Sequence, residues 1–296
     1  SSILYLCMEK ISILSPAKLN LTLKVAEKMD NSYHKIDSVI QIINFFDEIQ
    51  LSKSSKDEEI IFNFSDSSVK KNENLAFIAI ESFINFFQIK EGIKVDIKKN
   101  IPMGAGLGGG SSNAAAVLIG LHKLFKLNNF DQLVKLGAKI GSDVPLFLYG
   151  RSANLSGRGE IVETIKNPFN LNYLLIIPQI HSSTEELYSE WDKNQAAVSQ
   201  YFQNKDTKLN IKDHIIELRN DFLPLLIKKF VIYDEIFSTL KDFGLSNISI
   251  SGTGSSIFAI INNSYDCEPI IDYFKSSNQL KILQAQSIEG WQLQID

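Results

Sequence analysis

Residues 101–118 read Ile101-Pro102-Met103-Gly104-Ala105-Gly106-Leu107-Gly108-Gly109-Gly110-Ser111-Ser112-Asn113-Ala114-Ala115-Ala116-Val117-Leu118. Five of the chain's 16 glycines lie within seven of these positions. An alternating apolar run at 92–98 precedes them, and an alanine-rich helical run extends to about Leu127, so the unit is strand, glycine loop, helix. Consecutive N–H groups of such a loop, together with the free N–H groups of the following helix, bind anions. The stretch therefore predicts a polyphosphate-binding loop, since a tight turn alone would need only one or two glycines.

The loop departs from three common nucleotide-binding patterns. No lysine follows the glycines, so the P-loop pattern fails. Gly104, Gly106 and Gly109 match the dinucleotide-binding spacing, but that fold needs a second strand that ends in an acidic residue. Asp131 lies at a suitable distance but begins a helical pattern, which disfavours a Rossmann oxidoreductase. A protein kinase would add a valine two positions after the third glycine and a later His-Arg-Asp triplet, and the chain has neither.

Strand and helix patterns alternate through the rest of the chain. The apolar periodicity predicts extended segments at 10–26, 36–51, 60–64, 92–98, 146–155, 160–165, 173–178, 248–251 and 257–261. It predicts helices at 75–83, 130–140, 184–191, 214–229 and 231–243, followed by a last helix and two strands. Short connections between interspersed elements indicate the α+β or α/β class. A polar stretch at 166–170 suggests two domains, 1–168 and 169–296.

Composition excludes several classes of protein. The 296 residues are 44% hydrophobic and 22% charged, which is ordinary for a globular chain and unlike a disordered or fibrous one. The formal net charge is −4, and only three of the 30 basic residues are arginines, which argues against a nucleic-acid partner.

The two cysteines, Cys7 and Cys267, lie far apart in the sequence. They suggest neither a zinc site nor a disulfide framework, and they favour a reducing compartment. No apolar run is long enough for a membrane span, and the first residues lack the basic region of a signal peptide; Met8 is a possible start. We therefore expect a cytoplasmic protein without a membrane partner.

Three segments together resemble the GHMP small-molecule kinases. Residues 102–115 are similar to the phosphate loop of that superfamily, 15–21 to its first motif and 251–256 to its third. The resemblance runs from about Ile13 to Phe258. It implies an α+β, two-domain fold with an N-terminal ATP-binding domain and an active-site cleft between the domains.

Further residues resemble the GHMP kinases that act on a cytidine-linked alcohol. They are Tyr33-His34, the run 141–145, and Arg219-Asn220-Asp221 with Pro224. This chain has Asn31-Ser32 where the family usually has Asp-Gly, Ala105 where many members have glycine, and Lys28 in place of an arginine. The resemblance implies transfer of the ATP γ-phosphoryl group to the 2-hydroxyl of 4-diphosphocytidyl-2-C-methyl-D-erythritol, in the non-mevalonate isoprenoid precursor pathway. A homoserine, mevalonate or sugar kinase, and a catalytically silent nucleotide-binding protein of the same fold, are the alternatives.

The resemblance also implies functional roles for residues that would otherwise be interpreted as structural or surface residues. Asp143, otherwise a turn residue, is the expected base for the hydroxyl proton, and Lys18, otherwise a strand lysine, is its expected partner. Asn20 shares a strand face with Lys18 and could orient the substrate. Tyr33 and His34 are expected to bind cytosine, with Tyr188 as a second aromatic. Eleven consecutive residues are expected to bind ATP: Pro102, Met103, Gly104, Ala105, Gly106, Leu107, Gly108, Gly109, Gly110, Ser111 and Ser112. Mg²⁺ is expected to accompany the nucleotide, with Ser112 as one candidate ligand.

Overall fold

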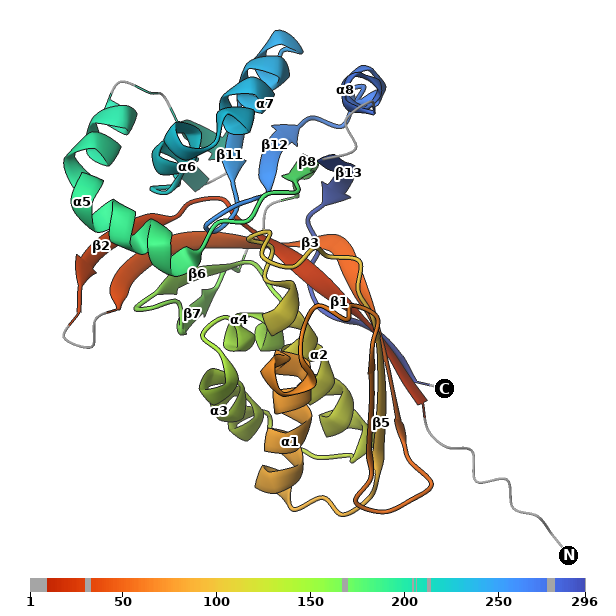
Figure 1. The fold of residues 1–296 in the computed structure, drawn as a ribbon. Helices are drawn as coiled ribbons and strands as arrows, with labels where there is room; N and C mark the ends of the chain where they lie inside the picture. Colours follow the sequence, from red (N-terminus) through yellow and green to blue (C-terminus); the bar gives the residue numbers. More distant parts are fainter. Residues whose placement is uncertain are drawn as a thin grey trace, which may run out of the picture.

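Two long antiparallel strands, β1 (Lys10–Asn20) and β3 (His34–Lys53), run through the whole molecule (Figure 1). The computed structural model describes residues 10–29, 33–166, 170–203, 205, 207–211, 214–275 and 280–295. The register of β1 on β3 shifts between Pro16 and Ala17, where proline lacks the N–H that a regular ladder needs. Beyond this bulge, β2 (Lys24–Lys28) pairs with the start of β3 and forms a hairpin that projects from the body.

The N-terminal lobe is a sheet covered by helices. Its main strand order is β14-β1-β3-β5-β4, with β4 (Ile60–Phe64), β5 (Ile93–Lys98) and β14 (Gln292–Ile295), and it continues through β6 (Ala153–Ser156) and β7 (Ile161–Thr164) beside β3. The 3₁₀ turn η1 (Lys71–Glu73) precedes the helices, which are α1 (Leu75–Phe87), α2 (Gly109–Leu124), α3 (Phe130–Ile140) and α4 (Val144–Tyr149). Helix α2 is buried almost all round. A side chain at Gly120 would meet Leu51 at 2.5 Å, so the small residues of α2 allow it to lie close to the sheet.

The C-terminal lobe has an antiparallel sheet of order β11-β12-β8-β13. Its strands are β8 (Asn172–Pro178), β11 (Ile248–Ile250), β12 (Ile257–Ile261) and β13 (Leu280–Gln286). Around it lie α5 (Thr184–Gln203), α6 (Leu223–Lys229), α7 (Val231–Asp242), α8 (Glu268–Phe274) and a separate strand pair, β9 (Lys208–Ile211) with β10 (His214–Glu217). None of the helices in the described residues combines the length and apolar character that crossing a membrane requires.

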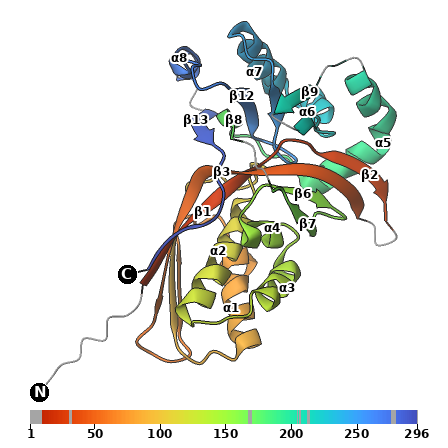
Figure 2. The same ribbon diagram turned by 180° about the vertical axis from the view of Figure 1, so that it is seen from behind.

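A shared apolar cluster joins the lobes. It combines Leu19 of β1, Ala105 and Leu107 of the glycine loop, and Leu175 and Phe258 of the C-terminal sheet. The glycine loop therefore lies at the junction of the lobes. The chain also returns at its end, because β14 pairs with β1, as the view from behind shows (Figure 2).

The mixed α and β composition agrees with the α+β prediction, and two predicted segments are wrong. Residues 146–149 belong to helix α4 rather than to a strand, because Pro145 begins a helix and the short apolar run carries no period of its own. Residues 214–217 form strand β10 rather than a helix. The division at 168/169 stays a prediction, since 167–169 lie outside the described residues. Cys7, Met8, Asn31 and Ser32 lie outside them as well.

Candidate active site

The glycine loop connects β5 to α2 and is held against both lobes. Its Leu107 carbonyl accepts the Lys18 N–H at 3.0 Å, and its Ala105 carbonyl accepts the Ser256 N–H at 3.1 Å. Gly106 has φ +74°, and a Cβ there would lie 2.1 Å from the Ser251 carbonyl oxygen. Glycine is required at this position because the third motif approaches so closely.

The first turn of α2 is available to an anion. Its N-cap residue, Gly108, has no side chain with which to cap the leading N–H groups, so these groups and the helix dipole can bind a phosphate. Ser111 is half-buried, whereas the Ser112 hydroxyl is buried and lies 2.8 Å from that of Ser15. Ser112 is thus already engaged in a hydrogen bond within the protein.

Sequence reasoning missed a buried ion pair beneath the loop. Asp47 is fully buried and accepts N–H groups of Asn100 at 2.6 Å and Ile101 at 2.8 Å, and its other oxygen accepts Lys99 Nζ at 2.6 Å. Burial lowers the pKa of Lys99, and the Asp47 charge acts in the opposite direction. A Cβ on Gly109 would lie 2.9 Å from Lys99 Nζ, so this ammonium group lies beside the start of α2.

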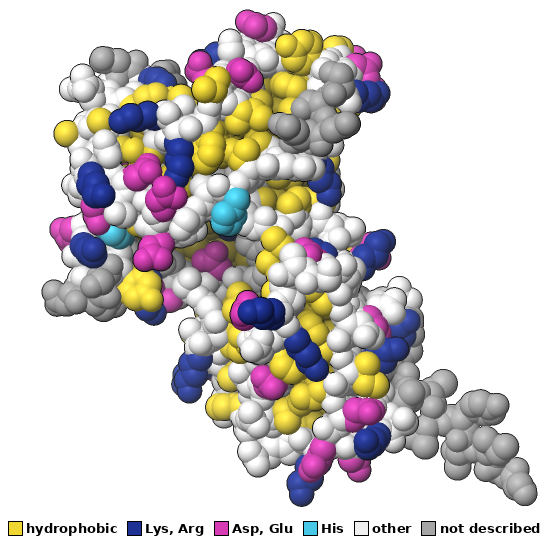
Figure 3. Space-filling view, viewed as in Figure 1, with side chains coloured by type: hydrophobic (Ala, Val, Ile, Leu, Met, Phe, Trp, Pro, Cys, Tyr) yellow, Lys and Arg dark blue, Asp and Glu magenta, His cyan; other side chains and the backbone are white. Residues whose placement is uncertain are grey.

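A cavity of about 830 Å³ opens between the lobes on the inner side of the loop. Figure 3 shows this face hollowed where the lobes meet. The cavity walls include Lys18 and Asn20 from β1, Gly106 and Gly108 from the loop, Asp143 before α4, Tyr33 and His34 from the hairpin, and Tyr188 from α5. Gly252 of the third motif lines the cavity as well, so the structure brings together residues from all three predicted motifs.

Lys18 and Asp143 face this cavity from different elements. The Lys18 side chain is 5% exposed and donates to Asn20 Oδ1. Burial lowers the pKa of its amine, and the charge of Asp143 partly offsets that effect. Asp143 precedes α4, but in the described chain its carboxylate does not cap that helix and so is available to the cavity.

The aromatic end of the cavity forms around His34. Its ring stacks on Tyr188 with centroids 5.0 Å apart and meets Trp191 edge-on at 5.5 Å. Tyr33 is 58% exposed, with the Arg158 guanidinium 5.1 Å from its ring centre. Burial, followed by the nearby Asp143 charge, raises the pKa of Tyr188 to about 12, so its hydroxyl stays protonated at neutral pH.

Sequence reasoning also missed Asp192 and Arg158 in this cavity. Asp192 Oδ1 accepts a hydrogen bond from His34 Nε2 at 2.7 Å, and Lys28 Nζ lies 3.7 Å from its other oxygen. The hydrogen bond from His34 is the main cause of a lowered Asp192 pKa. Asp192 follows Tyr188 by four residues, one helical turn, so helical spacing was a usable signal. The position of Arg158 depends on the β6–β7 turn and offered no such signal.

A smaller cavity, about 350 Å³, lies on the outer side of the loop. It is lined by residues 65–67 and by Lys99, Asn100, Ile101, Pro102 and Met103. The predicted loop residues therefore divide: Pro102 and Met103 face this outer cavity, Gly106 and Gly108 face the inner one, and Ala105 and Leu107 are buried in the core. Ala105 and Leu107 can offer a ligand only backbone groups.

Comparison with known proteins identifies related sequences and folds. Residues 74–151 match the model of the GHMP kinases N terminal domain. The chain is 33% identical over 279 residues to a 4-diphosphocytidyl-2-C-methyl-D-erythritol kinase of Caldicellulosiruptor saccharolyticus, covering 92% of this chain and 93% of that protein. It is 34% identical over 267 residues to the enzyme of the same name from Thermodesulfovibrio yellowstonii, covering 88% and 92%.

Solved structures share the fold. A crystal structure of 4-(cytidine 5'-diphospho)-2C-methyl-D-erythritol kinase superposes with a TM-score of 0.76 at 23% identity, over 94% of this chain and 100% of that one. Homoserine kinase from Cytophaga hutchinsonii gives a TM-score of 0.68 at 19% identity, over 100% of both chains. Methanococcus jannaschii mevalonate kinase gives 0.63 at 17% identity, over 94% and 98%. The predicted GHMP-type architecture is confirmed.

Proposed function

The chain belongs to the 4-diphosphocytidyl-2-C-methyl-D-erythritol kinase family of GHMP kinases, and from this membership we propose that it phosphorylates the 2-hydroxyl of that cytidyl substrate with ATP. The observation that carries the proposal is one cavity that combines the anion-binding loop, a Lys18–Asp143 pair and an aromatic end. The loop suits a phosphoryl donor, the charged pair suits an alcohol acceptor, and stacked rings suit a nucleobase. We expect both substrates to be small molecules of the cytoplasm.

On the donor side, the triphosphate would lie along the glycine loop and the first turn of α2. The γ-phosphate would then point into the inner cavity toward Lys18, and the nucleoside would extend toward the outer cavity. Lys99 is fixed beside the start of α2, where its charge would favour the phosphates.

On the acceptor side, cytosine would stack at the aromatic end. Tyr33 offers an exposed ring, Tyr188 supports the His34 ring by stacking on it, and stacking of a base on an aromatic ring contributes about 1–3 kcal/mol. The hydrogen bond to Asp192 orients the His34 ring, so its other nitrogen can contact the base edge. Lys28 and Arg158 line the same end and would favour the diphosphate of the substrate.

The chemical step requires in-line positioning and a proton acceptor. The 2-hydroxyl oxygen would attack the γ-phosphorus while the bond from that phosphorus to the β–γ bridging oxygen breaks, and ADP would leave with the electron pair. The hydroxyl proton would pass to the Asp143 carboxylate. Lys18, held by Asn20, would favour ionised Asp143 and the developing charge on the transferred group.

The residues present fit a metal ion carried by the nucleotide. Mg²⁺ in such sites is bound mainly by phosphate and water oxygens, with one or two protein ligands. Among the described residues, no group of three or more His, Cys, Asp and Glu side chains is placed to hold a metal ion. The Asp143 carboxylate lines the cavity and the Ser111 hydroxyl is half-buried at the start of α2, so both could contact the ion, whereas the Ser112 hydroxyl is fully buried. Bound Mg²⁺ would neutralise charge on the triphosphate.

A coupled assay of ADP release tests the proposal. The acceptors are the diphosphocytidyl substrate, free methylerythritol phosphate, homoserine, mevalonate and galactose. We expect turnover only with the cytidyl-linked alcohol, because the aromatic end supplies much of its binding. Equal turnover of free methylerythritol phosphate, or faster turnover of another acceptor, would show that the substrate assignment is wrong and that another GHMP kinase activity applies.

A further inference from the structure

The Arg219-Asn220-Asp221 segment lies between β10 and α6. It contacts the open edge of the β2–β3 hairpin, which carries Tyr33 and His34. The Leu23 N–H donates to the Arg219 carbonyl at 2.7 Å, and the Asp221 N–H donates to the Leu23 carbonyl at 2.9 Å. These bonds form a short parallel bridge between Leu23 and Asn220. The strand that leads to Tyr33 and His34 is therefore secured on one side by β3 and on the other by this segment.

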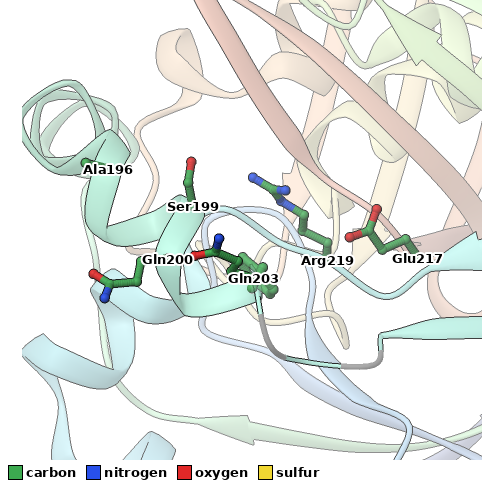
Figure 4. A pocket seen from close by; sticks show the side chains of 7 residues that line it. Ala196, Ser199, Gln200, Gln203, Glu217 and Arg219 are labelled. Carbon is green, nitrogen blue, oxygen red and sulfur yellow. The ribbon is translucent and has the colours of Figure 1, made fainter.

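Asp221 extends that contact with its side chain. Its carboxylate is 1% exposed; Oδ2 accepts the Val25 N–H at 2.9 Å and Oδ1 accepts Arg219 Nε at 2.7 Å. Figure 4 shows Arg219 facing the C-terminal half of α5, where it lines a separate cavity of about 460 Å³, and its guanidinium lies 5.0 Å from the centre of the Phe202 ring. Arg219 thus serves as the partner of Asp221, with its guanidinium in that separate cavity.

Asn220 points the other way, to the third motif. Its buried amide donates to the Gly252 carbonyl at 2.9 Å and to the Ile250 carbonyl at 3.2 Å, and its oxygen accepts the Phe222 N–H at 2.9 Å. Gly252 lines the inner cavity, where a Cβ would lie 3.5 Å from Lys18 Nζ.

The third motif continues this connection to the donor loop. The hydroxyl of Ser251, next to Gly252, donates to the Gly106 carbonyl at 2.8 Å. Asn220 therefore acts on the glycine loop through one intervening turn.

We propose that Asn220 and Asp221 are positioning residues that align the two halves of the active site separately. Asp221 sets the hairpin that binds the cytidyl acceptor, and Asn220 sets the third motif against the glycine loop that binds ATP. The assignment of the two ligands rests on the proposed function. Neither side chain lines the inner cavity, so each acts through the backbone that it holds.

The test compares variants by kcat, by KM for each substrate and by melting temperature. Asp221→Asn places an amide N–H₂ against one of two donors, Val25 N–H or Arg219 Nε, while keeping the side-chain shape. We expect KM for the cytidyl substrate to rise about tenfold, with KM for ATP within twofold of wild type, because only the acceptor half moves. Val25→Pro removes the same hydrogen bond from its other end and should give the same pattern.

Asn220→Asp keeps an acceptor for Phe222 N–H but removes both donors to the third motif. We expect KM for ATP to rise and kcat to fall, each about tenfold, with little change in KM for the cytidyl substrate. Tyr173→Phe is the matched control, since it removes a buried hydrogen bond to Gln41 away from the cavity. It should lower the melting temperature and leave both KM values unchanged.

The outcomes separate the proposals. If the Asn220 and Asp221 variants change only the melting temperature, as Tyr173→Phe should, or raise both KM values equally, the positioning roles are wrong. If Asp221→Asn does not fold, Val25→Pro decides the acceptor-side role. If the wild-type protein does not turn over the cytidyl substrate, the proposed function fails. Calorimetric binding of an ATP analogue to Asn220→Asp then still tests the donor-side role, which unchanged affinity would overturn.

Discussion

At the scale of single residues, the amine of Lys18 and the carboxylate of Asp143 have unequal surroundings. Lys18 is buried and held by Asn20, whereas Asp143 is half-buried and faces the cavity without a capping role in the described chain. Burial disfavours the charged amine and Asp143 favours it, so the two groups form one electrostatic unit. The buried charge of Lys18 therefore costs folding stability.

Asp143→Asn should lower kcat by about 10²–10⁴-fold, because it removes the proposed proton acceptor while keeping the size of the side chain. KM for both substrates should change little, since the lost interaction belongs to the transition state. Steady-state and single-turnover kinetics measure both values. Asp131→Asn, an exposed aspartate in the first turn of α3, is the matched control and should keep wild-type kcat. A variant that retains more than about a tenth of wild-type kcat, with chemistry rate-limiting, would remove Asp143 from the base role.

Lys18→Met should lower kcat and yet stabilise the unliganded protein by about 1 kcal/mol at neutral pH, because burial disfavours the charged amine more than Asp143 favours it. The folded-state pKa of Lys18 lies below its ordinary value of 10.5. The unfolded state therefore binds more protons between those two values, and the wild-type stability contributed by Lys18 rises with pH through that window. The advantage of the methionine should shrink there. Urea unfolding of both proteins from pH 7 to 10 measures the difference, and a constant difference would contradict this account.

At the scale of elements, the glycines of the loop differ in what they do. Some are required for close packing, whereas others leave space beside the first turn of α2. Gly108 has φ +70°, and a Cβ there would lie 2.8 Å from Phe147 and 3.1 Å from the Lys18 side chain, so any larger residue strains the fold. Substitution at Gly108 therefore cannot separate phosphate binding from packing. Gly110 lies in the first turn of α2 with ordinary helical φ, and a Cβ there would meet only Leu75, at 3.8 Å.

Gly110→Ala should raise the melting temperature, because alanine is favoured over glycine in helices by up to about 1 kcal/mol. It should also raise KM for ATP about tenfold, because in the proposed binding mode the triphosphate lies along this first turn and the added methyl group would crowd it. Calorimetric titration with a non-hydrolysable ATP analogue measures the affinity directly. Unchanged affinity together with higher stability would mean that phosphates do not approach this turn.

At the scale of the whole molecule, the end of the chain completes the N-terminal lobe. Strand β14 pairs with β1, and Trp291 packs on the N-terminal core, where a Cβ on Gly150 would lie 2.9 Å from its ring. In the sequence, the C-terminal lobe thus lies between two segments that both belong to the N-terminal lobe. The site needs both lobes, because its cavity takes Lys18 from one and Tyr188 and Gly252 from the other.

Trp291→Ala should lower the free energy of unfolding by about 2 kcal/mol, less than for a fully buried tryptophan because this side chain is half-buried. Tyr273→Ala, at an aromatic residue that is 59% exposed, is the control and should cost much less. Urea denaturation curves measure both. If the two variants are equally stable, the returning segment does not support the N-terminal lobe.

The sequence by itself determined those features whose causes lie within a few residues of each other. Glycine spacing identified the loop before α2. Asn74 caps α1 by accepting a hydrogen bond from the Ala76 N–H, only two residues away. Helix α3 and strand β12 begin and end where their apolar periodicity indicates. Only the tertiary structure decided the partners of the buried polar groups. Asp47 with Lys99, Asp192 with His34, and Asn220 with Gly252 are separated by 52, 158 and 32 positions. The sequence pattern around a residue reflects its preference for helix, strand or turn. The hydrogen-bond partner of its side chain depends instead on which distant segments pack together. A buried charge or amide must find that partner to be tolerated, so these contacts were settled by packing.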